Sequence, residues 1–189
     1  MSSWKSVCLK CLEASRLEGA ARLYDLGSGF SSWSEFSYST WGETLLRHYK
    51  EKSYPEVMSE IIPSLRMPIK QHEVDALVYV ASDPVSNRRR FFDPSHELAR
   101  QLSKSWGVPF VSHVFRRIPQ VFSQKDLSRE QRRFWASRLV SIRREKLEGV
   151  QRVLLVDDLL TTGETLRAHY GLLSGLGLTV KSWTLFRKF

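Results

Sequence analysis

The sequence predicts an α/β fold in which a mainly parallel sheet is flanked by helices. Three apolar runs, at residues 74–81, 153–156 and 179–186, are rich in the aliphatic residues of strands buried on both faces. Segments with the apolar spacing of amphipathic helices separate these runs. Strands that alternate with helices pair in parallel through right-handed crossovers. The length of 189 residues fits one such domain with a small appendage.

The elements before the first apolar run are mostly helical in pattern. Apolar residues with helical spacing predict a helix over residues 12–26, which Gly27 would end. A segment rich in serine and aromatic residues follows, with a candidate strand at residues 35–39. Two apolar stripes then predict two helices, with Trp41, Leu45, Leu46 and Tyr49 in the first stripe and Val57, Ile61, Ile62 and Leu65 in the second.

Helices and strands alternate after the first run. In order, we expect a turn at residues 82–84, an amphipathic helix at 98–106, a strand at 110–115, a polar loop at 116–127, a helix from the capping box at 128–131, the strand at 153–156, a helix up to Gly175 and a strand at 179–186.

Residues 153–166 carry the most specific pattern in the chain, an apolar run that ends on Asp157 and Asp158 and is followed by a turn of small residues. Two adjacent carboxylates are costly inside a core. We therefore expect them at the carboxyl end of the strand, where open α/β sheets bind ligands. There they can accept hydrogen bonds from ribose hydroxyls and hold Mg²⁺ directly or through water.

The turn after the two acids has the composition of a phosphate-binding loop. Its hydroxyls and the N–H groups at the start of the next helix favour an anion, and Gly163 permits backbone geometry that a side chain would obstruct. Carboxylates that can bind ribose hydroxyls, next to donors that can bind phosphate, indicate a site for a 5-phosphoribosyl ligand. The alternative is a buried strand that ends at an ordinary strand-to-helix turn. The loop residues are Leu160, Thr161, Thr162, Gly163, Glu164 and Thr165.

This stretch resembles the phosphoribosyl pyrophosphate (PRPP) motif of type I phosphoribosyltransferases. The resemblance implies that Asp157 and Asp158 contact the ribose hydroxyls as catalytic residues, with Mg²⁺ as the cofactor, and that residues 160–165 hold the 5′-phosphate. It also implies a type I phosphoribosyltransferase-like parallel sheet flanked by helices, with a small N-terminal appendage. Glu164 stands where that family usually has a small residue, and its carboxylate is unfavourable beside a phosphate unless it points away or helps to hold Mg²⁺.

Further motifs, in the same order along the chain, resemble the ComF family over residues 41–189. That resemblance implies a cytoplasmic, phosphoribosyltransferase-like protein linked to DNA uptake in natural competence, with PRPP and the uptake machinery as partners. The matching residues are those at 74–78 and 88–93, Leu98, Ala99, Arg117, Gln124, Leu127, Ser128 and Arg132.

The turn after the first apolar run would hold pyrophosphate in a true transferase. Ser82, Asp83 and Arg88 are therefore candidate PRPP-binding residues, although Asp83 would repel pyrophosphate unless Mg²⁺ lies between them. The chain differs from the ComF pattern here, with Tyr79-Val80-Ala81 in place of Pro-Val-Pro and Phe91-Phe92-Asp93 in place of Gly-Phe-Asn. PRPP binding and group transfer are therefore separate hypotheses.

The chain is basic, with 29 Lys and Arg residues, 20 Asp and Glu residues and a formal net charge of +9. A net charge of this size is informative about binding partners and not about the fold. Phosphorylated ligands and single-stranded DNA are candidate partners, and a solvated charged surface is the alternative. The candidate nucleic-acid contacts are Arg89, Arg90, Arg129, Arg132 and Arg133.

The cysteines Cys8 and Cys11 have the spacing of half a zinc site, but no second pair or nearby histidine completes it. We therefore expect no zinc, and we interpret residues 1–40 as an appendage, the remnant of a zinc-ribbon region, ahead of a phosphoribosyltransferase-like domain at 41–189. No apolar run reaches the length of a membrane span, and residues 1–12 lack the features of a signal peptide. A cytoplasmic protein without membrane insertion is expected.

Three functional hypotheses follow from these patterns. The first, which we favour, is a ComF-like PRPP-binding protein that acts in DNA uptake and natural transformation. The second is an active phosphoribosyltransferase in nucleobase salvage. The third is a non-enzymatic single-stranded DNA-binding protein that retains the fold.

Overall fold

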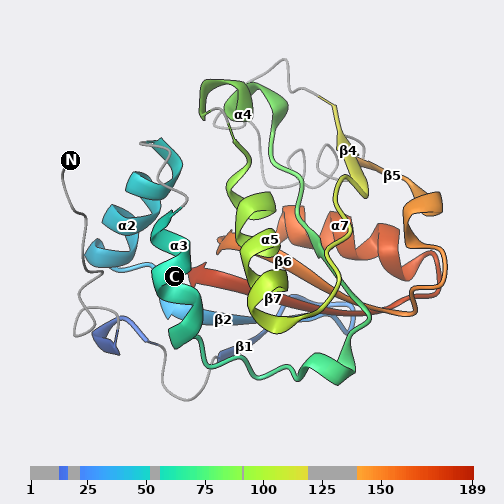
Figure 1. Cartoon of the computed structure of the whole chain (residues 1–189), viewed down its shortest axis with the longest axis horizontal. Helices are drawn as coiled ribbons and strands as arrows, with labels where there is room; N and C mark the ends of the chain where they lie inside the picture. Colours follow the sequence, from blue (N-terminus) through green and yellow to red (C-terminus); the bar gives the residue numbers. More distant parts are fainter. Residues whose placement is uncertain (1–12, 17–21, 52–55, 91, 119–139) are drawn as a thin grey trace.

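The computed structural model describes residues 13–16, 22–51, 56–90, 92–118 and 140–189. A five-stranded sheet with the strand order β1-β2-β7-β6-β3 forms the centre of the described chain (Figure 1). Its strands are β1 (Arg22–Asp25), β2 (Ser31–Ser37), β7 (Thr179–Arg187), β6 (Arg152–Leu160) and β3 (Ala76–Tyr79). β1 is antiparallel to β2, and the other pairs are parallel, which confirms the predicted α/β class.

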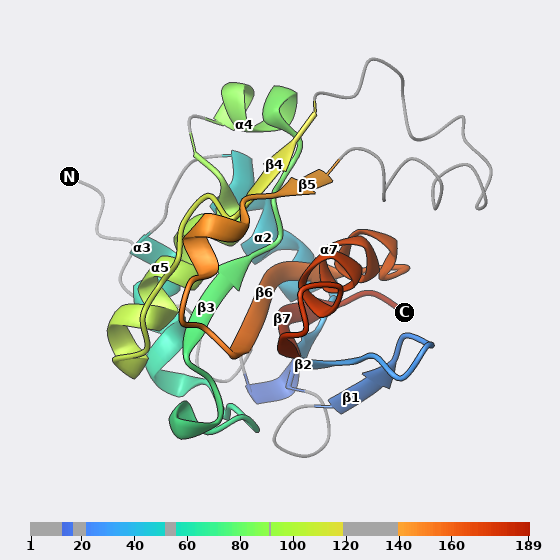
Figure 2. The same ribbon diagram turned by 90° about the vertical axis from the view of Figure 1, so that its right-hand side faces the viewer.

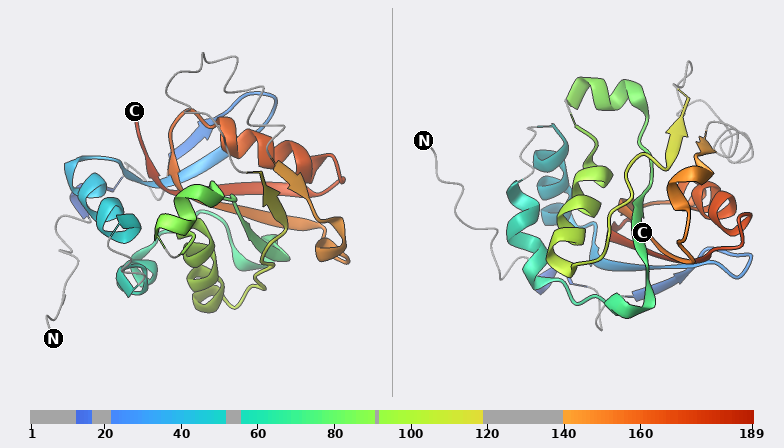
Figure 3. Two further views of the ribbon diagram at one scale, coloured as in Figure 1. Left: turned by 90° about the horizontal axis from the view of Figure 1, so that it is seen from above. Right: turned by 45° about the vertical axis from the view of Figure 1, so that its right-hand side comes forward.

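Helices cover both faces of this sheet, as Figures 2 and 3 show. α2 (Thr40–Glu51), α3 (Glu56–Ile61) and α5 (Pro94–Trp106) lie on one face, and α7 (Glu164–Ser174) lies on the other. The two apolar stripes at residues 41–65 therefore form α2 and α3 as predicted, with a 3₁₀ turn at Ile62–Ser64 after α3. Further 3₁₀ turns lie at Gln71–Glu73 and Arg144–Leu147.

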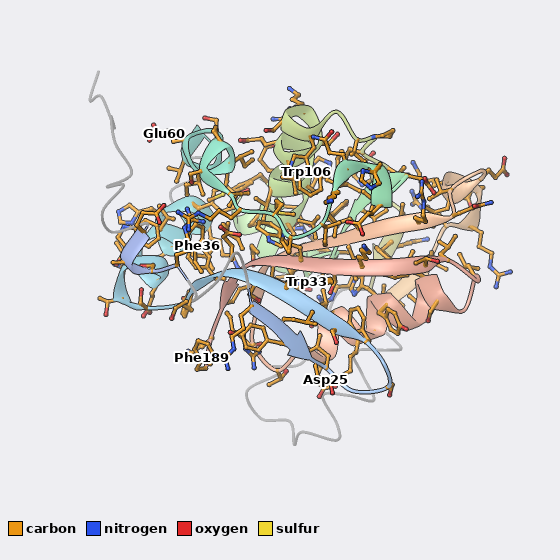
Figure 4. The ribbon with its side chains drawn as sticks, turned by 90° about the horizontal axis from the view of Figure 1, so that it is seen from below. Asp25, Trp33, Phe36, Glu60, Trp106 and Phe189 are labelled. Atoms are coloured by element: carbon orange, nitrogen blue, oxygen red, sulfur yellow. The ribbon has the colours of Figure 1, made fainter. Side chains whose placement is uncertain are left out.

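The hydrophobic core has two parts, one on each face of the sheet. Side chains from α2, α3 and α5 pack with the sheet around Phe36, which Figure 4 labels, and Trp183. The second part packs α7 against the opposite face, with Leu155 and Leu166 among its buried members. Because β6 is covered on both sides, Val153, Leu154, Leu155 and Val156 are fully buried, as its unbroken apolar run predicted.

A separate antiparallel pair consists of β4 (Phe115–Arg117) and β5 (Val140–Ile142). The prediction of a strand at 110–115 is wrong for most of that segment, since Phe110 forms only an isolated bridge to Leu77. His113 has a φ of 55°, and this left-handed backbone conformation interrupts a strand.

The N-terminal predictions need correction. The helix expected over 12–26 is wrong at Arg22–Asp25, which forms β1 at the edge of the sheet. An exposed edge strand has no buried face to mark its period, and pairing with β2 decides its conformation. Both strands lie before residue 40, so part of the expected appendage is built into the main sheet. The boundary at residue 40 stays a prediction.

Two more differences concern the site. β6 passes through both acids and ends at Leu160, so the strand is longer than the apolar run. The segment after β3 contains the helix α4 (Pro84–Arg90), which was not predicted. The helix expected from 128 and most of the loop at 116–127 lie outside the described residues. No helix of the described ranges is both long and apolar enough to span a membrane.

Candidate functional site

A cavity of about 210 Å³ opens where β3 and β6 end and α7 begins. Strand order explains its position, because β3 and β6 are adjacent and parallel, and their carboxyl ends meet at one edge of the sheet. Lys50 from α2, Ser95 from α5 and Arg117 from β4 contribute to its lining. The predicted site residues that line it are Ser82, Asp83, Asp157, Asp158, Leu160, Thr161, Thr162, Gly163, Glu164 and Thr165.

Arg88 lines a different cavity. This second cavity, of about 760 Å³, is bordered by aromatic and imidazole side chains and by Arg88. It shares Ala81, Ser82 and Arg117 with the first cavity, so the two meet at the turn after β3. The structure therefore brings together every predicted PRPP-binding residue except Arg88.

The two acids have separate hydrogen-bond partners. Asp157 Oδ1 accepts a hydrogen bond from the Ser95 hydroxyl at 2.8 Å and another from the backbone N–H of Asp158 at 2.9 Å. Asp158 Oδ1 lies 2.8 Å from Lys50 Nζ. Burial, and then the charge of Asp158, raises the pKa of Asp157 above its ordinary value. The charge on Asp157 is thus incompletely compensated, and a ligand hydroxyl or a cation would stabilise it.

Sequence reasoning missed Lys50 and Ser95. Each lies far along the chain from its carboxylate, with separations of 108 positions for Lys50 and 62 for Ser95. Lys50 is one of many basic residues on a predicted helix, and no local signal separates it from the others. Only the packing of α2 and α5 on the same face of the sheet brings both side chains to the acids.

The loop after β6 has its carbonyl groups bound from outside the cavity. Arg187 donates a hydrogen bond to the carbonyl of Thr161, and Arg167 Nη2 donates one to the carbonyl of Thr162 at 3.0 Å. Gly163 has a φ of 76° and precedes α7 without a side-chain cap. With these carbonyls engaged, the loop and the first turn of α7 can direct N–H groups toward an anion.

The extra carboxylate of the loop is neutralised. Glu164 lies 2.5 Å from Arg167 Nη2, and its side chain is only 10% exposed. Arg167 also donates to the carbonyl of Leu26 at 2.7 Å, which ties the loop to the segment after β1. The ion pair with Arg167 therefore compensates the charge of Glu164, which would otherwise repel a phosphate.

In the turn after β3, the N–H groups of Ala81 and Ser82 are bound by other side chains. Ser82 donates from its backbone N–H and its hydroxyl to Asp93, at 3.3 Å and 2.8 Å. Asp93 also caps α5 by accepting from the N–H groups of Ser95 and His96. The N–H of Ala81 donates to His169 Nε2 at 3.1 Å.

His169 connects this turn to the phosphate-binding loop. Since Nε2 accepts from Ala81, the proton is on Nδ1, which donates to the carbonyl of Thr165 at 2.7 Å. The side chain is fully buried, and burial lowers the pKa of His169 to about 4, which keeps the ring neutral. Asp93 and His169 were also missed: Asp93 was noted only as a departure from a family pattern, and no histidine was assigned a role.

The acid pair fits a Mg²⁺ that arrives with a phosphorylated ligand. Within the described ranges, no three His, Cys, Asp or Glu side chains are grouped to hold a metal ion. Mg²⁺ requires no such cage, since it usually binds one or two carboxylates together with substrate oxygens and water. Asp157 and Asp158 supply that donor set, and the raised pKa of Asp157 indicates that a cation there would be stabilising.

Two of the remaining predicted residues, Arg89 and Arg90, end α4. Arg129, Arg132 and Arg133, like Cys8 and Cys11, lie outside the described residues. The nucleic-acid and zinc predictions therefore stay predictions.

Comparisons with known proteins agree with this geometry. A family model for the phosphoribosyl transferase domain matches residues 93–188, which include both acids and the loop. Competence protein F of Haemophilus influenzae is 34% identical over 101 residues, or 52% of this chain and 44% of that protein. This match confirms the resemblance to ComF, although the aligned part is less than half of that relative's length.

Two solved structures illustrate the structural likeness. Adenine phosphoribosyltransferase from Leishmania tarentolae is 15% identical, with 88% of this chain and 94% of that chain covered and a TM-score of 0.44. Orotate phosphoribosyltransferase from Aeropyrum pernix is 18% identical, with 95% and 78% covered and a TM-score of 0.43. The match of the family model and the observed sheet confirm the predicted phosphoribosyltransferase-like fold class.

Proposed function

We propose that this chain, which belongs to the phosphoribosyl transferase domain family, binds PRPP in the cavity at the end of β6. The observation that carries the proposal is that one cavity holds both the acid pair and a loop whose carbonyls are engaged elsewhere. Asp157 and Asp158 accept hydrogen bonds from the ribose hydroxyls, and Leu160 to Thr165 hold the 5′-phosphate. Mg²⁺, when bound, neutralises charge on the pyrophosphate group.

Calorimetric titration with PRPP, in the presence and absence of Mg²⁺, tests this proposal. We expect saturable binding by the natural chain. Replacing both acids, Asp157→Asn with Asp158→Asn, should abolish binding while the fold persists, because amides keep the shape but lose the charge and half of the acceptors. Glu148→Gln is the matched control, since Glu148 is an exposed carboxylate before β6. An intact natural chain that gives neither heat nor a thermal shift with PRPP would contradict the proposal.

We propose further that the protein acts in the cytoplasm in DNA uptake during natural transformation. The support is the similarity to Competence protein F, whose name refers to competence. The test is the transformation frequency of a deletion strain complemented with the natural gene or with the Asp157→Asn variant. Full complementation by the variant would separate any role in transformation from the ligand site, and no defect on deletion would contradict the role itself.

Group transfer is the second candidate function. In that reaction the bond between ribose C1 and pyrophosphate breaks, a bond from a nitrogenous base to C1 forms, and pyrophosphate leaves. The larger cavity favours this candidate, because it is partly lined by Tyr79 and Phe115 and shares Arg117 with the PRPP cavity, which gives an acceptor a place beside the ligand. Pyrophosphate release across a panel of nucleobases is the measurement, and no release with any base would count against it.

Binding of single-stranded DNA is the third candidate, supported by the net charge of +9. Arg89, Arg90, Arg129, Arg132 and Arg133 are the proposed contacts. Affinity for an unstructured oligonucleotide should fall steeply with salt, because phosphate contacts release counterions. Lack of binding at low salt would rule this candidate out without affecting PRPP binding.

A further inference from the structure

The hairpin formed by β1 and β2, at residues 22–37, packs against the outer side of the loop after β6. Leu26 is buried there, and a Cβ at Gly163 would lie 2.9 Å from Leu26 Cδ2. The turn of the hairpin lies beside α7 (Figure 2), where Phe30 stacks on Tyr170 with ring centroids 3.9 Å apart. Leu26 does not line the PRPP cavity. The hairpin therefore supports the loop from the side away from the ligand.

Arg167 joins the hairpin to the loop through backbone carbonyls. Its Nη1 donates to the carbonyl of Leu26 at 2.7 Å, and its Nη2 donates to the carbonyl of Thr162 at 3.0 Å. The same Nη2 lies 2.5 Å from Glu164. The hairpin carbonyl thereby fixes the position of the guanidinium on which Thr162 and Glu164 depend.

Arg187, at the end of β7, makes a second connection. It donates a hydrogen bond to the carbonyl of Thr161, and its guanidinium carbon lies 5.0 Å from the ring centroid of Tyr24 in β1. A guanidinium over an aromatic face is attracted by the ring, so Tyr24 helps to hold Arg187 toward the loop. Neither Arg167 nor Arg187 lines the cavity. Both arginines therefore contact the loop from outside.

The geometry of the peptide bond connects these carbonyls to the donors of the loop. In a planar trans peptide, the C=O of one residue and the N–H of the next point in opposite directions. The bound carbonyl of Thr161 therefore fixes the direction of the N–H of Thr162, and the bound carbonyl of Thr162 fixes that of Gly163. Thr162 and Gly163 both line the cavity. Donors that are oriented before the ligand arrives bind an anion more tightly, because binding then costs less ordering.

We propose that the β1–β2 hairpin positions the loop after β6 through Arg167 and Arg187, and so sets the affinity of the site for a 5′-phosphate. The inference rests on the proposed PRPP binding. Both arginines are positioning residues, because they bind carbonyls of the loop and not the ligand. Tyr24 and Leu26, which hold them, lie outside the segment at 93–188 that matches the family model. Part of the segment expected to be an appendage thus serves the ligand site.

The test uses Arg187, because Arg167 also compensates Glu164 and its loss would have two effects. Dissociation constants for PRPP and ribose 5-phosphate are measured by calorimetry for the natural chain, Arg187→Met, Arg187→Lys and Arg22→Met. Arg22 is exposed, lies 6.0 Å from the Tyr24 ring centroid and does not line the cavity, so it controls for loss of one positive charge. We expect Arg187→Met to weaken both ligands by a similar factor, roughly fivefold to tenfold. Arg187→Lys keeps a donor and should lose less, and Arg22→Met should resemble the natural chain.

Two further measurements separate positioning from a general effect on the fold. The amide N–H signals of Thr162 and Gly163, measured by NMR without ligand, should shift in Arg187→Met and move back toward their natural positions in Arg187→Lys. Tyr24→Leu should weaken both ligands by roughly twofold to threefold. Combined with Arg187→Met it should add nothing further, because Tyr24 acts through Arg187.

Each result decides the inference. Unchanged affinity in Arg187→Met, with or without a loss of stability in urea, would overturn it, and additive losses in the double variant would overturn the role of the hairpin. In both cases binding by the natural chain leaves the proposed function intact. A natural chain that binds neither compound would overturn the proposed function, and this inference with it. If Arg187→Met does not fold, Tyr24→Leu decides: unchanged affinity together with unshifted Thr162 and Gly163 amides would overturn the inference.

Discussion

Two strand-to-helix connections border the same cavity, and they use their backbone in opposite ways. In the loop after β6, the carbonyls of Thr161 and Thr162 are bound by arginines, and Gly163 precedes α7 without a side-chain cap. In this loop the protein itself binds the carbonyl acceptors, and the N–H donors can point toward a ligand.

In the turn after β3, the protein instead binds the donor groups of Ala81 and Ser82. Asp93 takes the N–H and hydroxyl of Ser82, and His169 takes the N–H of Ala81. The carbonyl of Ala81 is the group bound by Arg117. The comparison teaches that position at the carboxyl edge of a sheet does not make a turn an anion site. What the structure shows is which backbone groups the protein itself has bound: carbonyls in the loop after β6, and N–H groups as well as a carbonyl in the turn after β3.

The largest effect is expected for His169→Phe, which changes the turn after β3. Phenylalanine keeps the ring packed on Phe115 but removes the acceptor, so the buried N–H of Ala81 is left unpaired. We expect a loss of about 3 kcal/mol in the free energy of unfolding, measured in urea. His169→Gln, which retains an acceptor, should lose less, and equal losses in the two variants would assign the effect to packing alone.

Gly163→Ala should have the next largest effect and should act on the other connection. The φ of 76° is unfavourable for alanine, and its Cβ would lie 2.9 Å from Leu26 Cδ2. We expect a loss of about 2 kcal/mol of stability, together with weaker binding of ribose 5-phosphate.

The control for that variant is Gly171→Ala in the same helix. A Cβ at Gly171 meets nothing within 4 Å, and the backbone there is helical. This substitution should leave stability unchanged or raise it by up to about 1 kcal/mol. A similar loss in both variants would refute a special role for the backbone of Gly163.

Asp93→Ala should cost about 1–2 kcal/mol, because it removes the cap of α5 and releases Ser82. Asp93→Asn keeps an acceptor oxygen and should cost less. Thermal unfolding of the two variants gives the comparison. Since Asp93 acts on the turn and not on the loop, affinity for ribose 5-phosphate should stay near that of the natural chain, and a large loss would show that the two connections are coupled.

The last test is a pH dependence of stability. Burial lowers the pKa of His169 from 6.5 to about 4 in the folded chain, so between these values the unfolded chain binds the proton more readily. The contribution of His169 is therefore full above pH 6.5 and decreases as the pH falls toward 4. Stability should fall more steeply over this range for the natural chain than for His169→Gln, and parallel curves would contradict the assignment of a neutral ring.

The sequence predicted the loop better than the turn, for a physical reason. Asp157, Asp158 and residues 160–165 are contiguous, and one strand, one turn and one helix place them all in one cavity. The partners of the turn come from α5 and α7, so their roles depend on packing that no local pattern expresses. The same limit explains the error at Arg22–Asp25, where pairing with β2 overrides a helical spacing. Ser82 was correctly placed at the cavity, but its donors were already used.

Under the proposed PRPP binding, the contact between Lys50 and Asp158 would make Lys50 a competitor for the ligand within the protein. A ribose hydroxyl that donates to Oδ1 of Asp158 meets an oxygen already held by the ammonium at 2.8 Å. Part of the binding free energy must then displace or reposition Lys50, and the measured affinity is the difference between the two interactions. Lys50 lies outside the segment that matches the family model, and it would in this way set the ligand concentration at which Asp157 and Asp158 become occupied.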